Sequence, residues 1–282
     1  MSFHPKPDVP DALERVSRCD ILIAPAPGTC GNVGQLACDV LALNLNLSRV
    51  GVLDFEHLIP VCGRDALYDD VGDGDVAGAL ACACEVYVGE VDFAADAKAR
   101  ETRTVVVAQI RSDANIGARR LFCEEYVNFL TTFAHPERVV LLSSLPSTYG
   151  ASAAQIGGTK WRRFGGDDDF KSMCAANELI ELEKNVYPPS EEIAESVDPH
   201  WALVDTIGTN TRVGCVVAVC SEGDNSVDGA GMALAAARAC GIDVGTEPKA
   251  PIPGATYIGP WRVPRSWEGA FGLREVSRDM FS

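Results

Sequence analysis

The sequence predicts an α/β protein, a three-layer α/β/α sandwich in which helices cover both faces of a mostly parallel sheet. Short apolar runs alternate along the chain with segments whose apolar residues recur at helical spacing, and this alternation is typical of strand–helix–strand units. Several runs are continuously apolar, which indicates strands covered on both faces. Apolar residues make up 47% of the 282 residues, so the chain can bury a large core.

Six strands are expected from these runs. The run "TRTVVVAQIRS" is continuous and rich in β-branched residues, whereas "CEVYVGEVDF" alternates between apolar and polar residues, as a half-buried strand does. The other strands are short apolar runs with polar, glycine or proline residues around them. In chain order, we expect strands at 20–26, about 49–55, 84–93, 102–112, 137–145 and 214–220.

Four helices are expected between and after the strands. After the first strand, apolar residues recur at helical spacing over 33–41. The segment 115–133 carries an apolar stripe with acidic residues on the opposite side, and 228–242 reads as an alanine-rich helix. A further helix is expected at about 170–185, inside a glycine-rich and polar stretch.

A single α/β domain is expected over residues 20–275. The polar, proline-containing residues 1–19 precede it, and a tail of residues 276–282 follows it. Within the domain, residues at about 146–200 interrupt the alternation of strands and helices, because they are rich in glycine, proline and acidic residues. We interpret them as an insertion.

The chain is strongly acidic: 40 Asp and Glu residues stand against 24 Lys and Arg residues, a formal net charge of −16. Such a surface repels phosphate backbones, so we expect no nucleic-acid partner. None of the 11 cysteines forms a C-x-x-C pair, and no apolar run approaches 18 residues. We therefore expect a reduced, soluble, intracellular protein without a membrane partner. The location expected is the cytoplasm, with the nucleus as a second location.

A glycine-rich turn, "GTCGNVG" at 28–34, follows the first strand and opens a helix, and Asp54 lies twenty residues after Gly34. Glycines at such a turn, with an acid at the end of the next strand, resemble a dinucleotide site. The spacing G-x-x-G-x-x-G differs, however, from the G-x-G-x-x-G of those sites. We favour a structural turn in which Gly31, Asn32 and Gly34 shape the start of the helix.

A second strand–helix turn, "SEGDN", is acidic. Its two carboxylates would repel a phosphate, and the turn contains no basic residue. A hard-cation site at Glu222, Asp224 and Asp228 is one alternative. We favour a helix start in which Gly223 makes the turn, Asn225 caps the helix and Asp228 occupies the capping-box position.

No assembled catalytic set is recognisable in the sequence. Ser143 and Ser144 end a strand, but the G-x-S-x-G frame of a nucleophile elbow is missing. Neither H-E-x-x-H nor a Cys/His zinc spacing occurs. A Ser-His-Asp triad stays open as an alternative, since its members meet only in three dimensions. We assign no catalytic residue, no metal ligand and no cofactor.

Seven short segments form a recognisable set in their order along the chain: "GNVGQLACD", "LNLSRVG", "QIRS", "FCEEYVNFL", "RVVLLSS", "SEGDN" and "PRSWEGAFG". They spread over most of the chain outside the insertion. The acidic turn after a strand, combined with the late P-x-S-W, is the most specific part of the set. Together the segments resemble the proteasome assembly chaperone 2 family.

The resemblance implies an α/β/α sandwich similar to nucleoside phosphorylases but without their catalytic residues. It also implies a heterodimer with proteasome assembly chaperone 1, and binding to the outer face of the proteasome α-ring, made of α subunits. The function expected is therefore that of a non-catalytic chaperone subunit that promotes α-ring assembly. A nucleoside phosphorylase- or hydrolase-like enzyme and a nucleotide-binding protein are the alternatives.

The resemblance also implies a role for the last three residues. To differing extents, members of the family and its partner end in a hydrophobic–tyrosine–any tail that enters pockets between α subunits. Met280, Phe281 and Ser282 take its three positions. Phe281 keeps the aromatic ring of the tyrosine and lacks the hydroxyl group, so the matched tail departs from the family pattern at one position.

Overall fold

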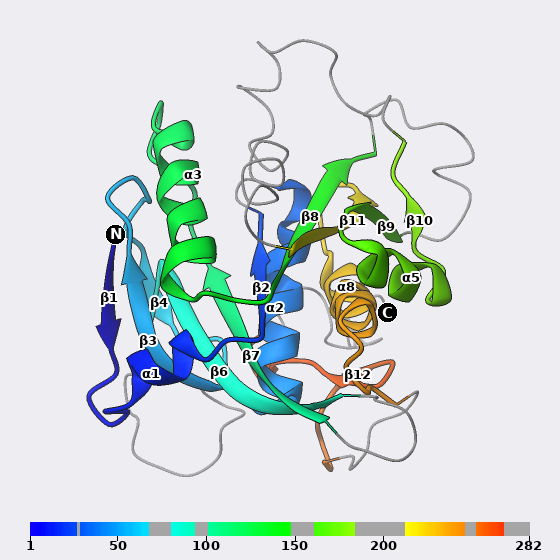
Figure 1. Cartoon of the computed structure of the whole chain (residues 1–282), viewed down its shortest axis with the longest axis horizontal. Coiled ribbons are helices and arrows are strands. Elements are labelled where there is room, and N and C mark those ends of the chain that lie inside the picture. Colours follow the sequence, from blue (N-terminus) through cyan, green and yellow to red (C-terminus); the bar gives the residue numbers. More distant parts are fainter. Residues whose placement is uncertain are drawn as a thin grey trace, which may run out of the picture.

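A nine-stranded sheet with helices on both faces forms the body of the protein (Figure 1). The computed structural model describes residues 1–26, 29–67, 80–93, 101–147, 161–183, 212–245 and 252–267. The strand order across the sheet is β1-β3-β6-β7-β2-β8-β11-β9-β10.

All six predicted strands are present, with bounds within two residues of those expected. The strands of the large sheet are β1 (Ser2–Pro5), β2 (Ile21–Pro25), β3 (Ser48–Asp54), β6 (Cys84–Phe93), β7 (Glu101–Ile110), β8 (Arg138–Pro146), β9 (Trp161–Gly165), β10 (Ile180–Glu181) and β11 (Arg212–Cys220). Two small ribbons pair β4 (Cys62–Arg64) with β5 (Leu80–Cys82) and β12 (Tyr257–Ile258) with β13 (Trp261–Arg262).

The four predicted helices are present with different ends, and α1 is a further helix that was not predicted. They are α1 (Ala12–Ser17), α2 (Val33–Asn44), α3 (Arg119–Asn128), α5 (Asp168–Ala176) and α8 (Ser226–Ala239). A 3₁₀ turn, Cys30–Asn32, precedes α2, a π-helical turn, Phe129–Phe133, follows α3, and a last 3₁₀ turn spans Arg265–Trp267. No helix among the described residues is both long enough and apolar enough to cross a lipid bilayer.

The sheet is mixed rather than mostly parallel, which corrects the prediction. The neighbours β7–β2, β2–β8, β8–β11 and β9–β10 are parallel, and the other four neighbouring pairs are antiparallel. The reason is clearest at β6 and β7, which are joined by residues 94–100 alone. Seven residues are too few for a crossover helix, so the chain must return antiparallel.

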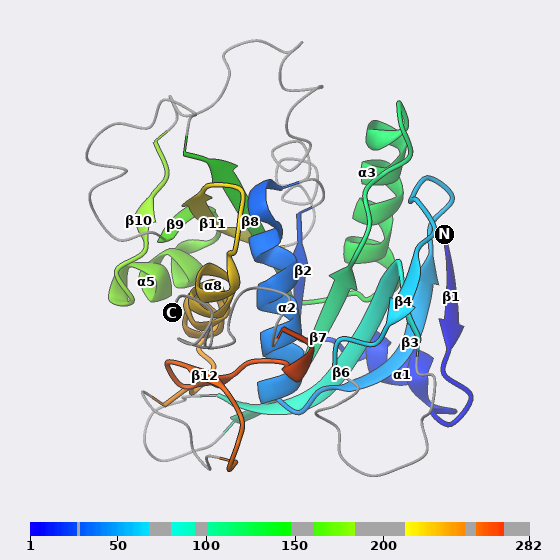
Figure 2. The ribbon, with the colours of Figure 1, turned by 180° about the vertical axis from the view of Figure 1, so that it is seen from behind.

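Both faces of the central strands are covered, as the continuous apolar runs predicted. In β2, Ile21 and Ile23 face the core beneath α2 and α8, while Leu22 and Ala24 face the core beneath α1 and α3. This alternation is the period-two geometry of a strand between two layers. Figure 2 views the face that carries α2 and α8.

The first residues join the sheet, although the sequence analysis began the domain at residue 20. β1 pairs antiparallel with β3, so that Phe3 lies opposite Leu53. The ring of Phe3 also lies 5.4 Å from that of Phe133, and Ala12 and Val16 of α1 are fully buried. A few apolar residues in a polar segment therefore suffice to fix it on the edge of the sheet.

The predicted insertion contributes β9, α5 and β10 within its described part, 161–183. The helix expected at about 170–185 begins at Asp168 and ends at Ala176. Asp167 caps its start by accepting a hydrogen bond from the backbone N–H of Phe170 (2.8 Å), and soon after its end Glu178 takes φ +62°. These local signals, rather than composition, set both ends.

Close packing around α2 yields a prediction for stability. A Cβ atom on Gly34 would lie 2.7 Å from the backbone carbonyl oxygen of Leu142 in β8. In an unobstructed helix, alanine is more favourable than glycine by about 1 kcal/mol. The contact with Leu142 therefore decides whether the substitution stabilises or destabilises the protein. Gly34→Ala should lower the free energy of unfolding by about 1–3 kcal/mol in urea titrations.

The matched control is Gly63→Ala, because a Cβ atom there would meet no atom within 4 Å. We expect its free energy of unfolding to stay within about 0.5 kcal/mol of the unaltered protein. An unchanged or higher stability of Gly34→Ala would contradict the packing described.

Candidate functional site

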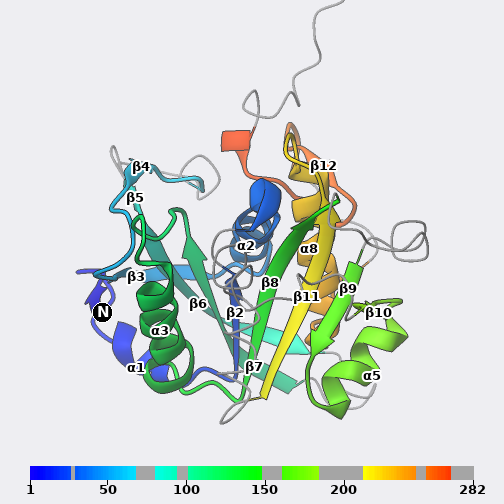
Figure 3. The same cartoon turned by 90° about the horizontal axis from the view of Figure 1, so that it is seen from above.

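The carboxyl ends of β2, β8 and β11 meet at one edge of the sheet, next to the starts of α2 and α8. Figure 3 shows β8 and β11 side by side, with both helices beside them. Open α/β sheets commonly bind ligands at this edge, so we treat it as the candidate site. Pro27 and Gly28 of the first turn lie outside the described residues.

The turn before α2 is filled by a carboxylate of the chain itself. Gly31 and Asn32 take left-handed conformations, with φ +63° and +55°. The backbone N–H of Gly31 donates a hydrogen bond to Oε1 of Glu222 (3.2 Å). A backbone N–H at the start of a helix is a usual position for a bound phosphate, and here Glu222 takes one such donor.

Hydrogen bonds from the ends of β8 and β11 hold this turn in place. Ser144 Oγ donates a hydrogen bond to the backbone oxygen of Cys30 (2.5 Å), which also accepts from the thiol of Cys220 (3.5 Å). Ser147 and Ser221, after β8 and β11, share a hydroxyl–hydroxyl bond of 3.0 Å. Ser144, at the strand end noted in the sequence, therefore has a structural bond.

The thiol of Cys30 is poorly suited to nucleophilic chemistry. Burial, together with the nearby Cys220 and Glu222, raises the pKa of Cys30 to about 12. A thiol with that pKa is protonated at neutral pH, whereas the thiolate is the reactive form. The most accessible sulfur at this edge is thus held in its unreactive state.

The turn before α8 corrects one predicted role. Asn225 occupies the cap position, but its side chain makes no capping bond. Its buried amide donates instead to the backbone oxygens of Ser221 (3.0 Å) and Gly223 (3.2 Å), and Asp224 Oδ1 accepts from the N–H of Ser226 (3.0 Å). Gly223 has φ +141°, as the turn requires, and Asp228 lies in the first helical turn.

The geometry disfavours the dinucleotide alternative. Such a site needs the acid on the strand adjacent to the glycine turn. β6 and β7 lie between β2 and β3, so Asp54, at the end of β3, is about 14 Å across the sheet from β2 at the usual strand spacing. The acid and the glycines belong to different parts of the edge.

A buried ionic network beside this edge was missed by sequence reasoning. Glu85 of β6, which is fully buried, accepts hydrogen bonds from Arg49 (2.6 Å) and Arg111 (3.0 Å). Arg111 also pairs with Asp39 of α2 (2.8 Å), which accepts from Gln109 as well (2.8 Å). Burial by itself would lower the pKa of Arg111, but Asp39 and Glu85 raise it overall. The buried charges are therefore paired, and their ion pairs and hydrogen bonds link α2 to β3, β6 and β7.

The predicted turn residues therefore gather where they were expected, around the starts of the two helices. Gly31, Asn32 and Gly34 shape the first turn, and Gly223, Asn225 and Asp228 belong to the second. The predicted tail, Met280–Ser282, lies outside the described residues.

A family model spans this whole arrangement. The model of the PAC2 family matches residues 22–238, from β2 to the last turn of α8. The chain belongs to the PAC2 family. The match includes both strand–helix turns and the strands between them, so the features that fill the candidate site lie within the family's region.

Curated relatives match over nearly their whole length. Proteasome assembly chaperone 2 of Bos taurus is 26% identical over 274 residues, which cover 93% of this chain and 95% of the relative. The Danio rerio protein of that name is 27% identical (89% and 91% covered), and the Homo sapiens protein is 24% identical (89% and 91% covered). This distant homology confirms the resemblance found in the sequence.

Two solved structures share the fold. Pyrococcus furiosus PbaA, described as an archaeal homolog of proteasome-assembly chaperone, has a TM-score of 0.55 and 14% identity, with 82% of this chain and 85% of PbaA covered. Pyrococcus furiosus PbaB, described as an archaeal proteasome activator, has a TM-score of 0.56 and 13% identity, with 86% and 90% covered. The mixed sheet with flanking helices is therefore a fold that solved structures share.

The raised pKa of Cys30 yields a second prediction. Below its pKa of about 12, the thiolate fraction rises about tenfold for each pH unit. At pH 7.5, iodoacetamide should therefore alkylate Cys30 much more slowly than the exposed Cys62. The rate at Cys30 should still rise between pH 8 and pH 10.

Peptide mapping by mass spectrometry after timed alkylation measures both rates in one sample. Alkylation of Cys30 as fast as that of Cys62, or a rate that levels off near pH 8, would show that Cys30 is an activated thiol and that the site is not closed as described.

Proposed function

We propose that this protein is a non-catalytic chaperone subunit that pairs with proteasome assembly chaperone 1 and promotes assembly of the proteasome α-ring. The observation that carries the proposal is the near full-length similarity to proteasome assembly chaperone 2 of several animals. The family match to residues 22–238 supports it further.

The state of the strand-end edge supports a non-catalytic role. Glu222 takes the backbone donor of Gly31, Ser144 is bonded to a backbone oxygen, and the pKa of the Cys30 thiol is far above neutral pH. An enzyme of the nucleoside phosphorylase or hydrolase type would need an anion site and an activated group at this edge. Glu222, Ser144 and Cys30 are instead engaged in bonds within and between the two turns.

Charge supports a protein partner with a basic surface. The formal net charge is −16, which speeds encounter with a basic partner and repels acidic ones. A tail that inserts one aromatic ring would add affinity of the order of 1.5–3 kcal/mol, and the heterodimer would supply a second contact.

Reconstitution with proteasome assembly chaperone 1 and α subunits of the same organism tests the proposal. We expect the three components to co-elute on size-exclusion chromatography, and α-ring formation to be faster with both chaperones than with either alone. Failure of this chain to bind either component would contradict the proposal.

Truncation tests the tail within the same assay. Deleting Met280–Ser282, or replacing Phe281 by alanine, should weaken binding of the chaperone pair to α subunits by roughly 10- to 100-fold. Phe281→Tyr, which restores the hydroxyl group of the family motif, is the matched control and should bind at least as tightly as the unaltered chain. Equal affinity of all four proteins would remove the tail from the mechanism while leaving the chaperone role intact.

A further inference from the structure

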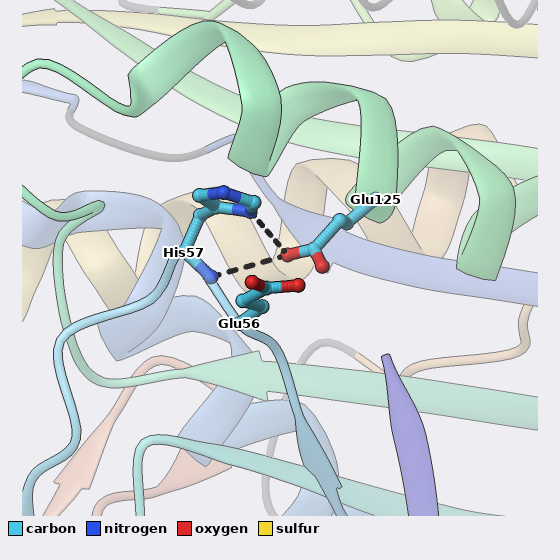
Figure 4. Close-up of side chains that lie close together, drawn as sticks. All are labelled: Glu56, His57 and Glu125. Atoms are coloured by element: carbon cyan, nitrogen blue, oxygen red, sulfur yellow. Dashed lines mark hydrogen bonds and ion pairs between the residues drawn. The ribbon is translucent and has the colours of Figure 1, made fainter.

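Three side chains of metal-binding type converge beyond the end of β3, apart from the two strand–helix turns. Glu56 and His57 lie in the turn after β3, and Glu125 lies on α3. Figure 4 shows the two carboxylates and the imidazole gathered together. One ligand atom of each residue lies within 4.8 Å of those of the other two.

The closest pair already has the separation that a shared zinc ion requires. His57 Nδ1 lies 3.4 Å from Glu125 Oε2. Zinc binds nitrogen and oxygen at about 2.0–2.2 Å in a tetrahedron, which places neighbouring ligand atoms about 3.4 Å apart. Glu56 is exposed, so its side chain can rotate to bring an oxygen into the third position.

The imidazole nitrogen is positioned to act as a ligand. Nδ1 of His57 is buried, and the group it faces is Glu125 Oε2, which pairs with it without a hydrogen bond. The backbone N–H of His57 donates to the same Glu125 oxygen (3.3 Å), which holds the turn against α3. A buried imidazole nitrogen beside two carboxylates is an arrangement that a cation would complete.

The charge around the cluster also favours a cation. Among the described residues, the positive group found at the cluster is the Met1 ammonium, 3.6 Å from Glu125 Oε1. That contact uses the carboxylate oxygen that does not face His57, so Oε2, which accepts from the backbone N–H of His57, still faces the imidazole. No Lys or Arg of the described residues makes an ion pair with Glu56 or Glu125.

We propose that Glu56, His57 and Glu125 form a binding site for a divalent transition-metal ion, with zinc as the best fit. An imidazole ligand selects zinc over magnesium and calcium, which prefer oxygen ligands alone. Three protein ligands leave one position for water or for a group of another protein. Bound metal would join the turn after β3 to α3, and this inference is independent of the proposed function.

Zinc titration by calorimetry tests the proposal, in a Cys62→Ser, Cys82→Ser background that removes the paired thiols of the β4–β5 ribbon. We expect one zinc ion per chain and a saturable rise in Tm. His57→Ala and Glu125→Gln should each weaken zinc binding at least tenfold. Glu124→Gln is the matched control, because Glu124 is exposed on the same helix and pairs with Arg120; it should leave the affinity unchanged.

Cobalt substitution gives an independent readout of the ligands. Cobalt at this site should show visible ligand-field absorption without a sulfur charge-transfer band, and His57→Ala should abolish the absorption. Glu56→Gln, at an exposed position, covers the case in which the other variants fail to fold and should also weaken binding. Absence of stoichiometric zinc binding, zinc affinity unchanged in the folded His57→Ala or Glu56→Gln variant, or a persistent sulfur band would overturn the proposal.

Discussion

The close packing of α2 against β8 and α8 is the constraint on which the rest of the structure depends. Gly34 lies against a backbone carbonyl of β8, and a Cβ atom on Gly229 of α8 would lie 2.5 Å from Cβ of Leu36. Helices that approach so closely need glycine at the contact. This packing sets α2 over the centre of the sheet, from where Asp39 reaches Arg111 and the first turn reaches Glu222.

The filled strand-end edge follows from that placement. With α2 fixed, the turn at Gly31 and Asn32 comes within hydrogen-bond distance of the acidic turn before α8. The two turns satisfy each other, and the Cys30 thiol beneath them stays protonated because burial and the neighbouring groups raise its pKa. Glu222 thus takes a backbone donor that an anion would use at this edge, and both turns lie within the region matched by the PAC2 family model.

Local sequence signals predicted the strands and the turn glycines, and three-dimensional contacts account for what they missed. Continuous apolar runs identified β2, β7, β8 and β11 because such strands are covered on both faces. Hydrophobic periodicity does not report strand direction. β7 runs antiparallel to β6 because the connection between the two strands is short. The Glu85–Arg111–Asp39 network joins residues far apart in the chain. The sequence signal for it was Asp39, an acidic residue within the otherwise apolar α2. Asn225 had the right position for a cap, but its buried amide found closer carbonyl partners.

Ligand binding at Gly31 tests the central claim most directly. Calorimetric titration of the full chain with inorganic phosphate and with adenosine, alone and together, measures whether the edge can accept a substrate. We expect no saturable heat at millimolar ligand, because Glu222 already accepts the hydrogen bond of the Gly31 N–H. Saturable phosphate binding by the unaltered chain, accompanied by cleavage of the nucleoside, would show an open catalytic site and contradict this expectation.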